Sequence, residues 1–267
     1  MAVWLITGAS GFLGRHLLAL LRAQAPAEVE TVCLGRNRAR REPAAPRFVQ
    51  ADLQSAPDVS RAVTLLEPSV VFHLAGQTPP GPPERYFQIN TQATVNLVRA
   101  LATLEHPVRL IIAGSAAELG PTALVAGPIS ESAPCRPVEP YGLSKWFASA
   151  AALRAKPPIE PIVARIFNAI GPGMPLGLAF GRFAARLAEP GQASDRLRVS
   201  DMRSRRDFID ARDVASALMA LALSGRPSTV YHVGSGQSRA VGEGFERLIQ
   251  LSGHAVAIEA VAPGDTA

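Results

Sequence analysis

The sequence predicts an α/β protein built on a doubly wound parallel sheet, with a smaller lobe near the C-terminal end. Three observations lead to this fold class. Short apolar runs alternate with longer stretches of helical periodicity through the first two thirds of the chain. The first run leads directly into a turn with three glycines, and the alternation ends near Asn168. Strand–helix alternation implies right-handed crossovers and therefore parallel strands.

Six apolar runs are expected to be the strands of the main sheet. Each run is short, rich in Val, Ile or Leu, and closed by turn residues, as buried strands are. They cover residues 3–7, 29–34, 47–50, 70–74, 108–113 and 159–166.

The stretches between these runs are predicted helices. In residues 11–24, Leu13, Leu17 and Leu21 recur on one face at helical spacing. The other helices are expected over residues 56–66, 84–104 and 140–154. Residues 76–83 are too rich in proline for a helix or a central strand, so we expect a stiff loop after the fourth strand.

The pattern becomes less regular after Asn168. A loop at residues 171–175 precedes a predicted helix at 178–187, and residues up to Arg206 are expected to be irregular. A helix at 211–223, a strand at 230–233 and a helix at 242–251 follow. We therefore expect residues 1–167 to form the main domain. Residues 168–267 form mainly the second lobe, with residues from about 206 to 233 returning to the main sheet.

The composition is that of a well-packed globule, with 48% apolar and 18% charged residues among 267. Cys33 and Cys135 do not have metal-ligand or disulfide-framework spacing, so we expect no metal and a reducing, cytoplasmic location. The N-terminus lacks a signal-peptide pattern, and no apolar run is long enough to span a bilayer. A membrane partner is therefore not expected.

A formal net charge of +5 raises the question of an anionic partner. The basic residues cluster at Arg36, Arg38, Arg40 and Arg41, and again at Arg203, Arg205 and Arg206. Neither cluster lies in a recognisable nucleic-acid-binding module, so we do not expect nucleic acid as the partner. A phosphorylated small molecule accounts for clustered arginines more simply.

The glycine turn predicts a dinucleotide site. Gly8 suits a tight turn, Gly11 allows backbone amides to approach a pyrophosphate, and Gly14 permits close packing of helix on strand. The positive end of the helix then faces the phosphates. The cofactor is also expected to contact the other residues of this turn, Ser10, Phe12 and Leu13.

The end of the second strand favours NADP(H) over NAD(H), although NAD(H) remains possible. No acid lies between Thr31 and Arg41, whereas Arg36 and Arg38 suit a 2′-phosphate. The alternative is that both arginines are solvated loop charges. Asp52, after the third strand, is expected to accept a hydrogen bond from the adenine amino group, or else to be a helix N-cap or loop carboxylate.

Three residues form a candidate catalytic set. Tyr141 and Lys145 stand one helical turn apart, and a nearby ammonium is expected to lower the pKa of the phenol. Ser115 follows the fifth strand, where its hydroxyl can bind a reacting carbonyl oxygen. A Tyr and a Lys at this spacing are common on exposed helix faces. The pair therefore indicates a catalytic site only together with Ser115 and the glycine turn. His73, in contrast, is expected to be a satisfied buried side chain.

Together these motifs resemble the extended short-chain dehydrogenase/reductase family, the NAD-dependent epimerase/dehydratase type. Residues 71–76, 164–173 and 206–215 are also similar to motifs of that family. The resemblance implies a Rossmann domain that binds NADP and a lobe that binds substrate. It implies further cofactor contacts by Leu53, Leu74, Ala75, Gly76, Asn90 and Ile166, and substrate contacts by Gln77, Ala116, Asn168 and Arg206. For Arg206 the alternative is a salt bridge with Asp207 or Asp210.

The resemblance also implies a homodimer whose interface is formed by helices 84–104 and 140–154. The apolar residues available for that interface are Val95, Val98, Leu101, Trp146 and Phe147. The alternative is that these side chains only face the sheet.

Within the family, the motifs are most similar to the branch that reduces GDP-bound 4-keto-6-deoxy sugars, so we expect NADPH-dependent reduction of such a keto group. Ala117 stands where the dehydratases carry a Glu base, and Leu119 stands where a Tyr is usual. Dehydration is therefore not expected. The alternatives are an epimerase with tightly bound NAD, a reductase of a ketone that carries no nucleotide, and a non-catalytic dinucleotide sensor. The sequence ends at Ala267 and is shorter than most members of the family, which favours the ketone reductase among these alternatives.

Overall fold

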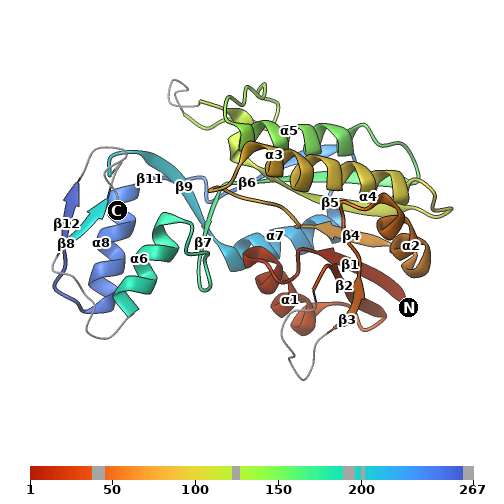
Figure 1. Cartoon of the computed structure of the whole chain (residues 1–267), viewed down its shortest axis with the longest axis horizontal. Helices are drawn as coiled ribbons and strands as arrows, with labels where there is room; N and C mark the ends of the chain where they lie inside the picture. Colours follow the sequence, from red (N-terminus) through yellow and green to blue (C-terminus); the bar gives the residue numbers. More distant parts are fainter. Residues whose placement is uncertain (38–45, 122–126, 189–195, 200–201, 261–267) are drawn as a thin grey trace. The chain divides into compact units, whose positions relative to one another are not determined.

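The computed structural model describes residues 1–37, 46–121, 127–188, 196–199 and 202–260 (Figure 1). The chain divides into two compact units. The first contains Met1–Phe167 and Ala211–Val233, and the second contains Asn168–Asp210 and Gly234–Ala267.

A seven-stranded sheet forms the centre of the first unit, in the order β10-β6-β5-β4-β1-β2-β3. Every neighbouring pair in it is parallel, which confirms the predicted fold class. Its strands are β1 (Ala2–Thr7), β2 (Val29–Gly35), β3 (Arg47–Gln50), β4 (Val70–His73), β5 (Val108–Ser115), β6 (Ile159–Ile166) and β10 (Thr229–Val233). The order reverses beside β1, which leaves the loops after β1 and β4 at the usual ligand-binding position of such sheets.

Helices cover both faces of this sheet (Figure 1). Helices α1 (Phe12–Gln24) and α7 (Ala211–Ser224) contact each other on one face. On the other face, α4 (Ala93–Leu101) contacts both α2 (Ala56–Leu66) and α5 (Pro140–Leu153). Fully buried aliphatic side chains from strands and helices, among them Leu5, Val71, Leu97, Leu110 and Val163, form the core.

The helix expected over residues 84–104 is present without a break from Pro83 to Leu101, but it is not a uniform α-helix. It consists of α3 (Pro83–Tyr86), the π-helix η1 (Phe87–Gln92) and α4. The Thr94 hydroxyl donates to the Asn90 carbonyl at 2.6 Å, and the Thr91 hydroxyl donates to the Ser144 carbonyl of α5 at 2.9 Å. A π-turn accommodates one additional residue within a helix, a feature common at functional sites. Here it directs Asn90 toward the loop after β4.

The second unit contains a three-stranded sheet of order β11-β9-β7 and a separate pair of strands, β8 and β12. Their bounds are β7 (Asn168–Ile170), β8 (Arg196–Val199), β9 (Arg205–Asp210), β11 (Ser238–Ala240) and β12 (Ala257–Ala260). The prediction that the chain is irregular between the helix at 178–187 and Arg206 is therefore wrong for β8 and the start of β9, and β7 was not predicted. Residues 206–210 belong to this unit, and the chain returns to the main sheet at Ala211.

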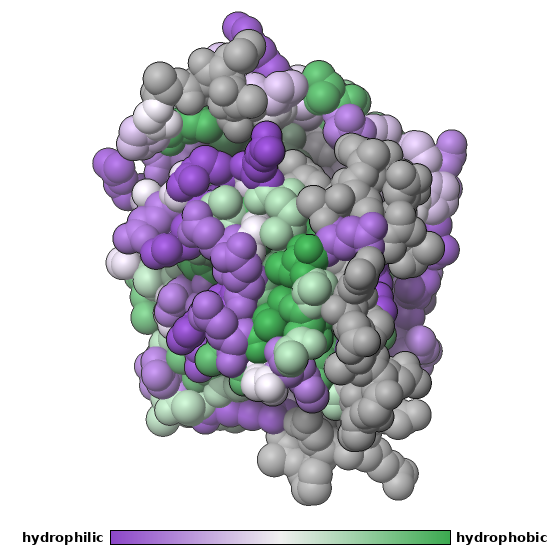
Figure 2. Space-filling model, turned by 90° about the vertical axis from the view of Figure 1, so that its left-hand side faces the viewer, coloured by the Kyte–Doolittle hydropathy of each residue, from purple (hydrophilic) through white to green (hydrophobic). Residues whose placement is uncertain are grey.

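Two helices, α6 (Ala179–Ala188) and α8 (Val241–Ser252), form the core of the second unit. The rings of Phe180 and Phe245 stack with centroids 4.5 Å apart, and Phe183 packs on Phe245 at 4.7 Å. Seen from the left-hand side of Figure 1, the surface shows a patch of apolar side chains next to polar ones (Figure 2). Among the described residues of the chain, no helix is long and apolar enough to cross a membrane.

Candidate active site

The glycine turn brings strand β1, helix α1 and the loop after β4 into close contact. Gly8 has φ +73°, and a Cβ there would lie 2.5 Å from the Ala75 nitrogen. A Cβ on Gly14 would lie 2.2 Å from the Gly8 carbonyl oxygen. No side chain caps the first turn of α1, and that turn contains no acidic residue. Its backbone amides are therefore suited to an anion.

His73 connects this turn to the helices on the opposite side of β4. Its Nδ1 lies 2.8 Å from the Thr7 hydroxyl and its Nε2 lies 3.0 Å from the Thr94 hydroxyl. The ring is buried, and burial, together with the Lys145 charge, lowers the pKa of His73 to about 3. As expected, His73 is a satisfied buried side chain.

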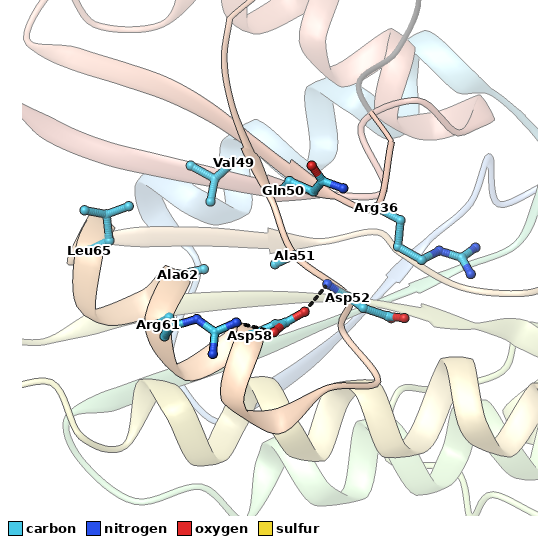
Figure 3. Close-up of a pocket in the computed structure, with 9 residues that line it drawn as sticks. All are labelled: Arg36, Val49, Gln50, Ala51, Asp52, Asp58, Arg61, Ala62 and Leu65. Atoms are coloured by element: carbon cyan, nitrogen blue, oxygen red, sulfur yellow. Dashed lines mark hydrogen bonds and ion pairs between the residues drawn. The ribbon is translucent and has the colours of Figure 1, made fainter.

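Arg36 and Asp52 line one open pocket of about 540 Å³ beyond the ends of β2 and β3. Figure 3 shows the Arg36 and Asp52 side chains pointing to the same end of this pocket. The Asp52 carboxylate accepts the Gln54 amide at 3.0 Å. Asp52 lies in the loop before α2 and is not the N-cap of that helix, which is Ser55. Arg38 falls outside the described residues.

Arg61 of α2 is a second cation in this pocket that the sequence analysis did not identify (Figure 3). Its guanidinium pairs with Asp58, whose carboxylate also accepts the Asp52 amide at 3.3 Å. The hydrogen bond from the Asp52 backbone amide is the largest cause that lowers the pKa of Asp58, and Ser55 and Arg61 act in the same direction. Arg61 stands three residues after Asp58, the spacing of an ordinary ion pair on a helix surface. The sequence alone therefore did not mark Arg61 as a pocket residue.

Ser115 and Tyr141 meet where β5 ends. Ser115 is the last residue of β5, and the 3-10 helix η2 (Ala116–Leu119) follows it. Tyr141 lies in the first turn of α5, with its phenol close enough to the Ser115 side chain to affect its pKa. The close approach depends on Gly142, because a Cβ there would lie 2.5 Å from the Ala117 carbonyl oxygen. The Tyr86 ring packs edge-on against Tyr141 at 5.8 Å.

Lys145 lies one turn further along α5, with 9% of its surface exposed. A Cβ added to Gly76 would lie 3.8 Å from Lys145 Nζ, so the ammonium lies next to the loop after β4. Burial lowers the pKa of Lys145, and the Glu118 charge opposes this effect.

The expected lowering of the Tyr141 pKa is not found. Burial is the largest effect and raises the pKa of Tyr141, while the Ser115 side chain acts in the opposite direction. The phenol is therefore held in its protonated form, which is the form that a proton donor requires.

Asn90 connects the loop after β4 to α5. Its Oδ1 accepts the Gln77 amide at 2.8 Å, and its Nδ2 donates to the Gln77 carbonyl at 3.1 Å and to the Ser144 hydroxyl at 2.9 Å. With 1% of its surface exposed, its amide is used in bonds within the protein. These bonds orient the loop that contains Gly76 and Gln77.

The remaining predicted contact residues of the first unit occupy the carboxyl ends of its strands, the turns that follow, or the first turn of α1. Leu74 and Ala75 follow β4, and the Ala75 amide donates to the Thr7 hydroxyl at 3.3 Å. Ala116 opens η2, while Ile166 ends β6 and is 6% exposed. Ser10 is exposed, whereas Phe12, Leu13 and Leu53 are partly buried.

Asn168 and Arg206, the other predicted substrate residues, lie together in the second unit. Asn168 of β7 is in register with Phe208 of β9, and its Nδ2 donates to the Asp207 carbonyl at 2.9 Å. Arg206 precedes Asp207 in β9, is exposed, and donates to the Arg205 carbonyl at 2.9 Å. The Asp207 carboxylate accepts the amides of Ser235 and Gly236 at 2.8 and 2.9 Å.

Residues 4–234 match the NAD dependent epimerase/dehydratase family. The chain belongs to this family. Its relatives include the GDP-6-deoxy-D-mannose reductase of Pseudomonas aeruginosa, 33% identical over 255 residues that cover 92% of this chain and 79% of that protein. The dTDP-6-deoxy-L-talose 4-dehydrogenase (NAD(P)(+)) of Kitasatospora kifunensis is 33% identical over 255 residues that cover 93% and 78%.

A solved structure described as RMD from Pseudomonas aeruginosa complexed with NADPH has the same fold as this epimerase/dehydratase chain. Its TM-score is 0.82 at 31% sequence identity, and the alignment covers 97% of this chain and 87% of that one.

Two positions in η2 of this epimerase/dehydratase chain depart from the expected family pattern. The backbone amide of Ala117 donates a hydrogen bond to the Ser115 hydroxyl at 3.2 Å, and the methyl side chain of Ala117 has no acid or base function. Leu119 is 5% exposed and therefore packs inward. The residue between them, Glu118, is fully buried and was missed by the sequence analysis.

Proposed function

We propose that this protein uses NADPH to reduce a keto group on a nucleotide-bound 4-keto-6-deoxy sugar. The observation that carries the proposal is the close packing of the first turn of α5, which contains Tyr141, on η2 directly after Ser115. Lys145 lies one turn away beside Gly76. Membership of the epimerase/dehydratase family supports it. So do two relatives whose names specify oxidoreduction of 6-deoxy sugars carried by GDP or dTDP.

The residues present fit a dinucleotide. Gly8, Gly11 and Gly14 allow the pyrophosphate to approach the uncapped amides of α1. Arg36 and Arg38 pair with the 2′-phosphate, and Asp52 accepts from the adenine. Asn90 supports this site through Gln77 and Ser144 rather than by touching the cofactor. Asn168 and Arg206 bind the sugar nucleotide, with Arg206 on its diphosphate.

The chemistry divides among three side chains. The bound dinucleotide supplies the hydride for the carbonyl carbon. Tyr141 gives its phenolic proton to the carbonyl oxygen, so that the ketone becomes a hydroxyl. Ser115 donates a hydrogen bond to the same oxygen, and Lys145 binds the nicotinamide ribose and stabilises the tyrosinate that remains.

We further propose a homodimer in the cytoplasm. Leu101 is fully buried and Val98 packs on the core, so these two residues face the sheet. Phe147 of α5, in contrast, is 44% exposed and contacts the rings of Trp146 and Phe87 at 5.2 and 6.2 Å. The free thiols of Cys33 and Cys135 support a reducing compartment.

The function is tested by following NADPH absorbance with GDP- and dTDP-4-keto-6-deoxy sugars and with simple ketones. Tyr141→Phe should lower kcat roughly 10² to 10⁴-fold, the usual contribution of general acid catalysis. It should leave NADPH affinity close to that of the wild type, because the ring is retained. Tyr231→Phe on β10 is the matched control and should behave as the wild type.

A Tyr141→Phe enzyme that keeps more than about a tenth of the wild-type rate would contradict the mechanism. Fluorescence titration should show tighter binding of NADPH than of NADH. Interconversion of sugar epimers without net NADPH consumption would instead indicate an epimerase.

A further inference from the structure

A buried ion pair lies directly behind Ser115. Glu118 is fully buried and Arg165 of β6 is 4% exposed, and Arg165 Nε donates to Glu118 Oε2 at 3.3 Å. The other carboxylate oxygen, Oε1, accepts the backbone amide of Ser115 at 2.8 Å and the Ser149 hydroxyl at 2.9 Å. One side chain thus connects the end of β5, the helix α5 and the strand β6.

The surroundings of this pair are built to hold it in one geometry. Arg165 Nη1 lies 3.1 Å from His232 Nε2, and Arg165 Nη2 donates to Cys135 Sγ at 3.1 Å. A Cβ on Gly114 would lie 2.8 Å from Glu118 Oε1, so glycine leaves the room that the carboxylate needs. A buried pair of opposite charges is often no more stabilising than apolar residues of the same size. Stability alone therefore does not account for it.

The position of the pair offers a better reason. Tyr141, Lys145 and Ser149 are spaced four residues apart and share one face of α5. Glu118 bonds to the last of these residues and to the amide of Ser115. It therefore determines how the strand end that carries Ser115 is placed against the helix face that carries Tyr141.

We propose that Glu118, held by Arg165, is a positioning residue that fixes Ser115 relative to Tyr141 and Lys145 for proton transfer. This inference rests on the proposed reductase function. The Glu118 charge also acts on the same groups. Burial is the main cause that raises the pKa of Tyr141, and Glu118 adds to it. Burial lowers the pKa of Lys145, and Glu118 opposes that change.

The test uses a double variant, because Glu118→Gln alone would leave the Arg165 cation buried without its partner and destabilise the fold. In Glu118→Gln/Arg165→Met both charges are removed while the volumes are retained. The matched control is Glu160→Gln/Arg109→Met. It removes the ion pair at the opposite end of β5 and β6, where Arg109 Nη2 and Glu160 Oε2 are 3.4 Å apart.

The double variant at 118 and 165 should lower kcat roughly 10 to 100-fold, because a misplacement of about 1 Å at a reacting group costs this much. KM and NADPH affinity should change little, since neither residue binds a ligand. The control variant should keep the wild-type kcat. A purely structural role would instead give wild-type kcat in whatever fraction of the protein folds, which active-site titration measures.

Hydrogen exchange provides a second readout that does not depend on the reaction. The amide of Ser115 should exchange faster in the double variant than in the wild type, while the strand β1 exchanges unchanged. Unchanged exchange at Ser115, or unchanged kcat per folded molecule, would overturn the inference. A wild-type protein that reduces no ketone would refute the proposed function instead, and the exchange experiment would still decide the role of Glu118.

Discussion

His73 has a proton-binding behaviour that follows from its burial. Its ring lies between the hydroxyls of Thr7 and Thr94, and its pKa falls from 6.5 to about 3. In the unfolded chain this histidine binds a proton below about pH 6.5, whereas in the folded chain it stays neutral. The stability that it contributes is therefore complete above pH 6.5 and decreases as the pH falls toward 3.

Urea unfolding at pH 7 and pH 5 measures this effect. The wild type should lose more stability on acidification than His73→Gln, by at most about 1.4 kcal/mol per pH unit below the unfolded pKa. His254→Gln, at an exposed position just after the end of α8, is the matched control and should follow the wild type. Equal pH dependence of the wild type and His73→Gln would show that His73 does not govern this acid response.

At the residue scale, the sequence was most informative where a single position has an unusual requirement. Gly8 and Gly14 are such positions, since any Cβ there would collide with backbone. The pair of Glu118 and Arg165 gave no such signal, because the two residues are 47 positions apart and each alone resembles a surface charge. The tertiary structure brings the partners of a buried charge together, so the spacing of residues along the chain does not reveal such pairs.

The contact between α5 and η2 decides whether Tyr141 reaches Ser115, and it depends on one glycine. Gly142→Ala would normally stabilise a helix by about 1 kcal/mol. Here the new methyl group would lie 2.5 Å from the Ala117 carbonyl oxygen, so α5 must move away from η2. We therefore expect a lower melting temperature and a large loss of kcat. Thermal unfolding monitored by circular dichroism, together with single-turnover kinetics, checks both; a stabilised variant with normal kcat would contradict the packing argument.

Helices and strands were predictable from the sequence where their apolar residues recur with the period of a helix or form a continuous run. The strands of the main sheet are apolar runs bounded by turn residues, and all six expected runs correspond to strands β1 to β6. The strands β9 and β11 read Arg-Arg-Asp-Phe-Ile-Asp and Ser-Arg-Ala, which lack a continuous apolar face. The π-helix η1 was not predictable either, because one additional residue in a turn hardly alters the apolar pattern of a helix.

For the whole molecule, the proposed dimer makes Phe147 the most informative position. Its ring is 44% exposed on α5, next to Trp146. Phe147→Asp would place a charge in the proposed interface between the two copies of helices 84–104 and 140–154, so we expect a monomer in sedimentation velocity at micromolar concentration. Leu65→Asp on α2, where the leucine is 65% exposed, is the control and should leave the assembly unchanged. A wild-type protein that sediments as a monomer would rule out this interface.

The chain leaves its first unit at Phe167 and re-enters it only at Ala211. Strand β10 pairs with β6, and α7 packs against α1. The ribosome therefore adds α7 and β10 only after residues 168–210 of the second unit. Until then β6 is an edge strand whose Ile162, Val163 and Ala164 are among the most buried residues of the finished sheet. At about 5 to 20 residues per second, the ribosome takes roughly 3 to 12 s to add residues 168–228. For that interval the nascent protein presents an unpaired apolar edge, the kind of surface at which chains aggregate and chaperones bind.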